Sequence, residues 1–333
     1  MIRLKGFSWA IVCLFITQNA FAQQSQFQIN GFAQGTTYAI TYYSSKEIVI
    51  KKEIDSLLVD IDQSMSIYKR NSDISNFNAV ETDCIVVDSY LQDVLRFAFK
   101  TYKESNGLFD ITVKPLVSLW GFGPEKVINY PDSAKVSETL NSVGMDKLVF
   151  SKNKLCKKAK GISIDVNGIA QGYSVDVVAK YLSKRGIKDY IVEIGGEVVA
   201  RGVKPNQENF RIAVQRPGQE NNETNYIIEL KNKAITTSGS YEKFRMYKSQ
   251  KISHHINPKT GYPFTSSILS ATVIANTGME SDALDNVLIA MHPDEAIRFA
   301  NSRKKIDIYL IYEENGILKE GFSKGFSKYI SPN

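Results

Sequence analysis

Apolar and polar residues follow two different periods along this chain. They alternate from residue 27 to 43 around Gly31 and Gly35, which predicts a β-hairpin. Apolar residues then recur at helical spacing, and helices are expected at residues 54–65, 89–106, 173–185, 282–291 and 294–302. Short runs rich in β-branched and aromatic residues predict further strands at residues 190–194, 210–214, 227–230, 269–275 and 306–312.

The order of these elements decides the expected fold class. Strands and helices are mixed without the regular βαβ alternation of a parallel sheet, so we expect an α+β fold with mixed sheets and packed helices. The 333 residues are 43% hydrophobic and 23% charged, which is enough for a substantial core. The sequence shows no internal repeat, low-complexity tract or long linker. We therefore expect one compact unit over residues 23–333.

The first 22 residues have the layout of a secretory signal peptide. Arg3 and Lys5 precede an apolar run, and the small residues Ala20 and Ala22 stand before the expected cleavage point. The run is shorter than the roughly 20 apolar residues that a membrane-spanning helix needs, and no later stretch does better. We expect an exported protein, periplasmic or associated with the cell envelope, and not integral to the membrane.

The charge balance argues against nucleic acid as a partner. The whole chain carries a net charge of +6, and loss of the two basic residues of the leader lowers it further. Lys and Arg are scattered among acidic residues and form no stripe with interleaved aromatics. A solvated surface is the better interpretation.

Two cysteines, Cys84 and Cys156, remain after the leader, and each stands in a short apolar segment. Export would permit a disulfide, but two cysteines do not make a disulfide framework. The frequency with which unpaired cysteines are buried favours two free thiols over a bridge.

Two segments near the middle of the chain carry polar residues in unusual settings. Residues 108–124 predict a core strand that leads into an aromatic turn around Trp120. Gly168 and Gly172 stand just before a predicted helix, where backbone N–H groups could receive a phosphate. The spacing fits neither the dinucleotide fingerprint nor the Walker pattern, so neither a Rossmann site nor a P-loop is supported.

A hydroxyl cluster at residues 236–241 and an Asn-Pro-Lys-Thr-Gly turn at residues 257–261 could hold phosphate oxygens, or could be ordinary turn chemistry. His254 and His255 precede that turn. On a strand they would point to opposite faces, so at most one would face a site. No metal-binding histidine spacing occurs, which disfavours zinc.

Asp282 and Asn286 lie four residues apart, on one face at the start of a predicted helix. Their side chains are oxygen donors of the kind that suits Mg²⁺, which accepts few protein ligands when a substrate phosphate completes its shell. The alternative interpretation makes Asp282 a helix N-cap.

Taken together and in this order, these segments resemble the ApbE family of FAD:protein FMN transferases. The resemblance also covers Gly35-Thr36-Thr37-Tyr38, Met65-Ser66-Ile67-Tyr68 and residues 72–78, and it spans nearly the whole chain after the leader. It implies an α+β fold that binds FAD without a Rossmann motif, with Mg²⁺ at the diphosphate. The implied reaction moves FMN from FAD to a Thr or Ser hydroxyl of an acceptor protein and releases AMP. The implied acceptor is an exported or membrane-attached redox protein that carries a short Thr-containing flavinylation motif.

The resemblance assigns site residues by position. Asp282 is the principal metal carboxylate, the backbone oxygen of Gly168 and the side chain of Asn286 complete the metal donors, and His254 is the candidate for removing the acceptor proton. The remaining matched positions line the FAD pocket: Gln34, Tyr68, Leu108, Phe109, Asp110, Asp165 and Gln171.

The chain also departs from the family pattern. Gln171 stands where many members have Lys, Asn286 where Thr is usual, Asn257 where Asp is usual, and Ser240 where Asp or Asn is common. These changes remove charge or a hydroxyl from the pocket. Two alternatives follow for the flavin site, an FAD pyrophosphatase that releases FMN and AMP, or a catalytically impaired flavin-binding protein. A third alternative is an exported scaffold that binds no flavin.

Overall fold

The computed structural model describes residues 24–80, 84–124, 130–215, 224–239, 244–247 and 250–332. The predicted signal peptide at residues 1–22 lies outside these ranges, as does Ser240. Within them, every helix is too short or too polar to cross a membrane.

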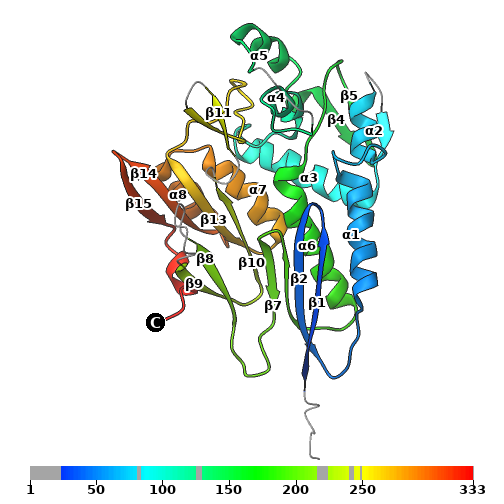
Figure 1. Cartoon of the computed structure of the whole chain (residues 1–333), viewed down its shortest axis with the longest axis vertical. Helices are drawn as coiled ribbons and strands as arrows, with labels where there is room; N and C mark the ends of the chain where they lie inside the picture. Colours follow the sequence, from blue (N-terminus) through cyan, green and yellow to red (C-terminus); the bar gives the residue numbers. More distant parts are fainter. Residues whose placement is uncertain are drawn as a thin grey trace, which may run out of the picture.

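An eight-stranded sheet forms the centre of the molecule, and all of its neighbouring strands pair antiparallel (Figure 1). This agrees with the expected α+β class. The predicted hairpin is confirmed as the first two strands of the sheet, joined by a turn at Gln34 and Gly35. In spatial order the strands are β1 (Ser25–Ala33), β2 (Thr36–Ser44), β6 (Asp189–Ile194), β7 (Glu197–Arg201), β10 (Lys233–Gly239), β13 (Ile268–Ala275), β14 (Asp307–Glu314) and β15 (Ile317–Phe322).

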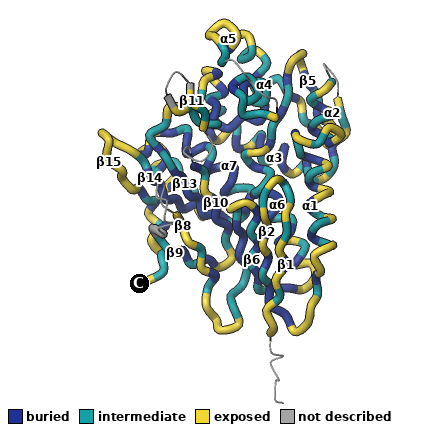
Figure 2. Tube along the Cα trace, viewed as in Figure 1, coloured by how far each residue is buried: buried dark blue, intermediate teal, exposed yellow. Residues whose placement is uncertain are grey.

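Both faces of the middle of this sheet are buried, because alternate side chains enter different cores (Figure 2). On β14, Ile308 and Leu310 face the helices, whereas Tyr309 and Ile311 face the opposite layer. The helices that share the first core are α1 (Lys51–Met65), α2 (Asp73–Ala79), α3 (Ser89–Glu104), α6 (Asn167–Lys184), α7 (Gly278–Ile289) and α8 (Pro293–Asn301).

Smaller elements cover the rest of the sheet and one end of the molecule. A hairpin and a C-terminal 3₁₀ turn lie on the face opposite the helices, and two short helices with a further hairpin lie at one end (Figure 1). On the face opposite the helices lie β8 (Phe210–Gln215), β9 (Thr224–Leu230) and η3 (Phe326–Tyr329). At the end of the molecule lie α4 (Lys114–Leu119), α5 (Ser133–Leu140), β11 (Phe244–Tyr247) and β12 (Gln250–Ser253). A separate small sheet has the strand order β3 (Cys84–Val86), β5 (Lys154–Lys157) and β4 (Leu148–Ser151), and η2 (Met145–Lys147) precedes β4.

The strand predicted at residues 108–117 is wrong. Residues 111–113 form the 3₁₀ turn η1 (Ile111–Val113), and α4 follows it directly. The carboxylate of Asp110 accepts a hydrogen bond from the Thr112 N–H and so caps the turn, and Pro115 stands in the first turn of α4. The apolar residues of this segment favoured a strand, although Asp110 and Pro115 are signals of a helix start.

The prediction of free cysteines is also wrong. Cys84 and Cys156 form a disulfide that joins the neighbouring strands β3 and β5, where they stand directly opposite each other. Cys84 is exposed. Because the two residues are 72 positions apart, their pairing is a consequence of strand register that local sequence does not reveal.

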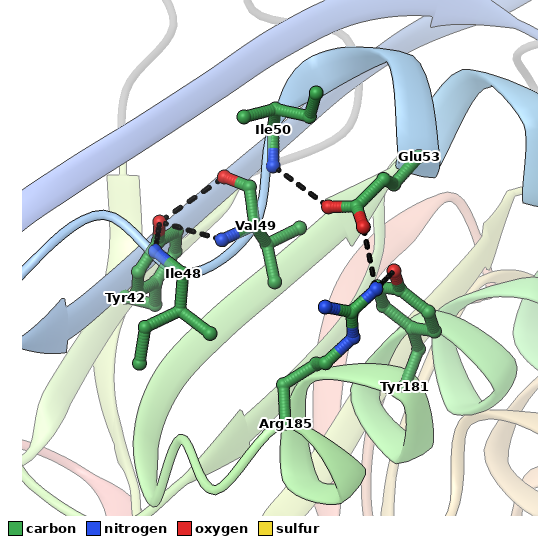
Figure 3. Close-up of polar contacts among 7 residues, drawn as sticks. All are labelled: Tyr42, Ile48, Val49, Ile50, Glu53, Tyr181 and Arg185. Atoms are coloured by element: carbon green, nitrogen blue, oxygen red, sulfur yellow. Dashed lines mark hydrogen bonds and ion pairs between the residues drawn. The ribbon is translucent and has the colours of Figure 1, made fainter.

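The start of α1 is tied to the end of α6 by a group of polar contacts (Figure 3). Glu53 accepts from the Ile50 N–H and from Arg185, which also donates to the hydroxyl of Tyr181. The buried Tyr42 hydroxyl donates to the carbonyl of Val49, just before α1. These contacts hold α1 against α6, whose other end carries the candidate site.

Candidate active site

Helices α6 and α7 meet at two glycines, and this close approach brings the predicted metal residues together. A Cβ on Gly172 would lie 2.3 Å from the carbonyl oxygen of Gly278, and one on Gly278 would lie 2.4 Å from the carbonyl oxygen of Gly172. Neither position has room for a side chain. α6 begins at Asn167 and not at the predicted residue 173, so Gly172 lies inside the helix.

Asp282 is buried at this crossing. Its Oδ2 accepts from the backbone N–H of Gly172 at 2.8 Å. That N–H is therefore engaged by a carboxylate and is not available to a phosphate. Burial raises the pKa of Asp282 to about 7; the Gly172 N–H opposes this shift, and the nearby charge of Asp176 adds to it. The N-cap of α7 is Thr277, so Asp282 is not the cap.

Asn286 lies one turn further along α7 and faces the start of α6. Its Nδ2 donates to the carbonyl of Asp282 at 2.9 Å and lies 3.4 Å from the carbonyl oxygen of Gly168. The structure thus brings together all three residues that the sequence assigned to the metal.

These donors fit Mg²⁺. They are a carboxylate, a main-chain carbonyl and a carboxamide, and the oxygen atoms of such groups are the ligands that this ion takes. Rotation of the Asn286 amide exchanges its nitrogen and oxygen, so the same side chain can present an oxygen. In the described part of the chain, no three His, Cys, Asp or Glu side chains form a group that could hold a metal. A site with so few protein ligands suits an ion whose shell a substrate completes.

Sequence reasoning missed Asp285. This residue is 2% exposed, and its Oδ2 accepts from the hydroxyl of Thr236 on β10 at 2.7 Å. Its Oδ1 accepts from Nδ2 of Asn286 at 3.0 Å. Burial and the nearby charge of Asp282 raise the pKa of Asp285 well above its usual range. A signal was present in the sequence, because Asp285 interrupts the apolar stripe of α7 beside Leu284.

Gln171 lies in the first turns of α6 and Asp165 just before the helix, and the sequence assigned both to the flavin pocket. The amide of Gln171 packs against Gly195, where an added Cβ would lie 2.6 Å from its Nε2. Gln34, in the β1–β2 turn, donates to Ser174 of α6 at 2.8 Å. Its Oε1 is buried and makes no hydrogen bond within the described residues. The turn of the hairpin and the start of α6 therefore form one wall.

Tyr68 and Asp165 form the next part of this wall. Tyr68 is 63% exposed. Burial of the Tyr68 hydroxyl raises its pKa, and the nearby charge of Asp165 adds to this shift. The backbone N–H of Asp165 donates to the carbonyl of Ile111 at 2.7 Å. Burial raises the pKa of the Asp165 carboxyl, against the opposing charge of Lys114.

Leu108, Phe109 and Asp110 lie just before η1, whose first residue bonds to Asp165, but the Asp110 carboxylate is engaged in protein contacts. Its carboxylate accepts from the Thr112 N–H at 2.7 Å and from the Met145 N–H at 3.3 Å. Burial raises its pKa. Phe109 is buried, and Leu108 is partly buried against the same core. Asp110 also borders a cleft of about 400 Å³ whose other lining residues include Tyr102, Gly107, Asp146 and Lys259.

His254 and His255 do not face opposite ways, as strand geometry had suggested. β12 ends at Ser253, so the alternation of a strand does not extend to them, and their ring centroids lie 4.0 Å apart. His255 is buried, with its Nε2 3.0 Å from the Ser238 hydroxyl and its Nδ1 2.8 Å from the Ser253 hydroxyl. His254 is less buried and packs against Phe122.

The hydroxyls of β10 connect the histidines to the acidic residues. Thr236 and Ser238 lie two residues apart on one face of the strand, where the first contacts Asp285 and the second contacts His255. The turn that follows the histidines is closed by its own bonds, since Asn257 Oδ1 accepts from the Lys259 N–H at 2.9 Å.

Comparison with known proteins gives one consistent result. The sequence profile of the ApbE family matches residues 34–310. A FAD:protein FMN transferase of Vibrio cholerae is 33% identical over 337 residues, which cover 98% of this chain and 100% of the relative. A FAD:protein FMN transferase of Haemophilus influenzae is 34% identical over 317 residues and 90% of each chain.

Solved structures agree with these sequence relatives. The flavin transferase ApbE from Vibrio cholerae superposes with a TM-score of 0.83 at 32% identity, over 92% of this chain and 100% of that one. The apo form of the flavinyl transferase ApbE from Pseudomonas stutzeri gives a TM-score of 0.83 at 28% identity, over 93% of this chain and 98% of that one. The expected fold is confirmed.

Proposed function

The chain belongs to the ApbE family, and from this premise we propose that it transfers FMN from FAD to a hydroxyl group of an acceptor protein and releases AMP. The relatives that carry the name FAD:protein FMN transferase align with almost the whole chain. One structural observation carries the assignment to this site: the crossing of α6 and α7 holds Asp282 beside the Gly168 carbonyl and Asn286.

Asp282, Asn286 and the carbonyl of Gly168 would hold Mg²⁺. When bound, this ion supplies positive charge against the diphosphate and the leaving AMP phosphate. The pocket wall made by Gln34, Tyr68 and the start of α6 would hold the flavin side of FAD. A bound substrate held in this way presents its FMN phosphorus in a fixed orientation.

His254 is the proposed base. A Thr or Ser hydroxyl of the acceptor loses its proton to the imidazole while its oxygen forms a bond to the FMN phosphorus. The bond between that phosphorus and the bridging oxygen of AMP breaks, and AMP leaves with the electron pair. Histidine suits this role because its ordinary pKa lies near neutral pH. The adjacent ring of His255, fixed by two serine hydroxyls, limits where the His254 ring can lie.

We also propose that the protein works outside the cytoplasm, on a redox protein that carries a Thr-containing flavinylation motif. Two features support export. The leader at residues 1–22 has the signal-peptide layout, and the disulfide between Cys84 and Cys156 is a bond that oxidising compartments preserve.

The test mixes the chain from residue 23 onward with FAD, Mg²⁺ and an acceptor domain, and records intact masses. We expect the acceptor to gain the mass of FMN minus water, and we expect no gain with an acceptor whose Thr is replaced by Ala. Asp282→Asn should abolish the gain. AMP release at the same rate without acceptor would instead identify an FAD pyrophosphatase, and FAD binding without AMP release would identify a flavin-binding protein that has lost catalysis.

A further inference from the structure

The start of α1 and the end of α6 lie side by side. Arg185, at the end of α6, donates to Glu53 in the first turn of α1 (Figure 3). The adjoining loops are neighbours as well, because the end of β2 pairs with the start of β6. Two segments that are far apart in the sequence, residues 46–53 and residues 184–188, therefore form one surface. We call this surface the basic end.

The basic end carries an excess of exposed positive charge. Six exposed basic side chains stand on it: Lys46, Lys51, Lys52, Lys184, Arg185 and Lys188. Lys51 pairs with Asp55, and Arg185 pairs with Glu53. In the described part of the chain, the other four lysines have no ion-pair partner, and neither have the acids Glu47 and Asp189 of the same surface. Unpaired lysines therefore outnumber unpaired acids here.

The basic end and the candidate active site lie at opposite ends of α6. The helix has 18 residues, which correspond to roughly 27 Å of length. Its first turn carries the Gly168 carbonyl beside Asn286, and Lys184 is its last residue. A partner bound to the basic end would therefore leave the flavin wall and the metal residues uncovered.

The residue types of the basic end fit a membrane surface better than a protein surface. Protein interfaces centre on aromatic side chains and Arg and are depleted in Lys, whereas lysines dominate here. Ile50 is 51% exposed and directly precedes Lys51 and Lys52. Lysines around an exposed aliphatic side chain suit the anionic headgroups of a phospholipid bilayer and the apolar boundary beneath them.

We propose that the basic end binds the surface of membranes that contain anionic phospholipids. The lysine ammonium groups would contact headgroup phosphates, and Ile50 would enter the headgroup layer. The contact is reversible and depends on salt, because the charges are exposed and are screened beyond about 8 Å at physiological ionic strength. Bound in this way, the protein holds the first turn of α6, and with it the candidate active site, away from the lipid. The inference does not depend on the proposed flavin transfer.

Vesicle sedimentation tests the proposal. The chain from residue 23 onward is mixed with vesicles of phosphatidylcholine and phosphatidylglycerol in equal parts, or of phosphatidylcholine alone. We expect binding to the anionic vesicles only, and release of the protein at high salt. A triple variant with Lys52→Gln, Lys184→Gln and Lys188→Gln should bind roughly hundredfold more weakly, because each lysine near an anionic surface contributes roughly fivefold in affinity. Circular dichroism and thermal unfolding verify that the variant folds.

The matched control combines Lys103→Gln, Lys152→Gln and Lys154→Gln. These lysines are also exposed and, among the described residues, have no ion-pair partner. They stand at the end of α3 and around the β4–β5 turn, so the control loses the same charge outside the basic end. Its affinity for anionic vesicles should stay within about threefold of that of the wild type.

Three results would overturn the proposal: equal losses in the two triple variants, equally strong binding of the wild type to phosphatidylcholine alone, or no binding to either kind of vesicle. If vesicles are not bound but the triple variant at the basic end no longer modifies the acceptor, the basic end serves an acidic protein instead. Flavin transfer by the wild type is measured separately in solution, so a chain that transfers FMN without binding vesicles refutes only this inference.

Discussion

The hydroxyl of Thr236 donates to Oδ2 of Asp285 at 2.7 Å, and this bond joins the central sheet to the helix that carries the candidate metal residues. Both partners are buried. Loss of this bond should therefore affect both the stability of the fold and the orientation of the Asp285 carboxylate.

Replacing Thr236 with Val should lower the free energy of unfolding by about 1–3 kcal/mol, because the shape is kept while a buried carboxylate oxygen loses its donor. Urea unfolding at pH 7.5 measures the change. Thr237→Val is the control, since the Thr237 side chain is exposed and its hydroxyl contacts Thr272. Equal losses in the two variants would contradict a special role for the bond to Asp285.

The stability of the metal-free protein should fall as the pH rises from about 4 to about 7. Asp282 has its pKa raised from 3.8 to about 7, so in this window the folded chain holds a proton that the unfolded chain has released. One such proton lowers the free energy of unfolding by up to about 1.4 kcal/mol per pH unit. Burial raises the pKa values of Asp176 and Asp285 as well, and these groups act in the same direction.

Urea unfolding in EDTA across this pH range measures the slope. Asp282→Asn should flatten it, and Mg²⁺ should restore wild-type stability near pH 7 because a cation binds the ionised carboxylate. A slope that is the same in both proteins would show that Asp282 does not carry the shift.

The two adjacent histidines should differ in their effect on the rate. If His254 takes the acceptor proton, His254→Ala lowers the turnover number by roughly 10²–10⁴. His255→Gln keeps a polar group near Ser238 and should lower it less than about tenfold, through looser placement of His254. Single-turnover flavinylation followed by mass spectrometry gives both rates. A larger loss in His255→Gln than in His254→Ala would reverse the two roles.

The sequence was sufficient where a local period decided the structure. The β1–β2 hairpin was predicted from its alternation and α3 from its apolar stripe, and in the structure Asp88 caps α3. Gly168, Asp282 and Asn286 were grouped correctly through the family resemblance, and the crossing at Gly172 explains physically why they meet.

Sequence reasoning failed where contacts distant along the chain decide the outcome. The partner of Cys84 is set by the register of β3 against β5. The buried carboxylate of Asp285 is held by the hydroxyl of Thr236, which lies 49 positions earlier in the chain. His254 and His255 were placed on a strand that ends one residue before them. In each case the local residues were compatible with another structure, and packing selected the observed one.

Breaking the disulfide should lower the free energy of unfolding by about 2–4 kcal/mol, because the bridge closes a long loop in the unfolded chain. Its cysteines are 72 positions apart. Cys84→Ser and the double serine variant should lose the same amount, measured by urea unfolding. A reducing agent should bring the wild type to the level of the variants and leave the variants unchanged. A wild type that does not respond to reduction would contradict the contribution of the bridge.

The glycine at the centre of the α6–α7 crossing should tolerate no side chain. A Cβ at Gly172 would lie 2.3 Å from the carbonyl oxygen of Gly278 and 2.5 Å from Cβ of Asp282. Gly172→Ala must therefore push the helices apart, which should lower the free energy of unfolding by about 1–3 kcal/mol or more and weaken Mn²⁺ binding. Gly168→Ala is the matched control for stability, because its added Cβ would come no closer than 3.4 Å to Asn286. Urea unfolding of both variants separates the two positions, and Mn²⁺ titration of Gly172→Ala measures the metal affinity. Wild-type stability and metal affinity in Gly172→Ala would show that the close approach of α6 and α7 is not required to form the metal site.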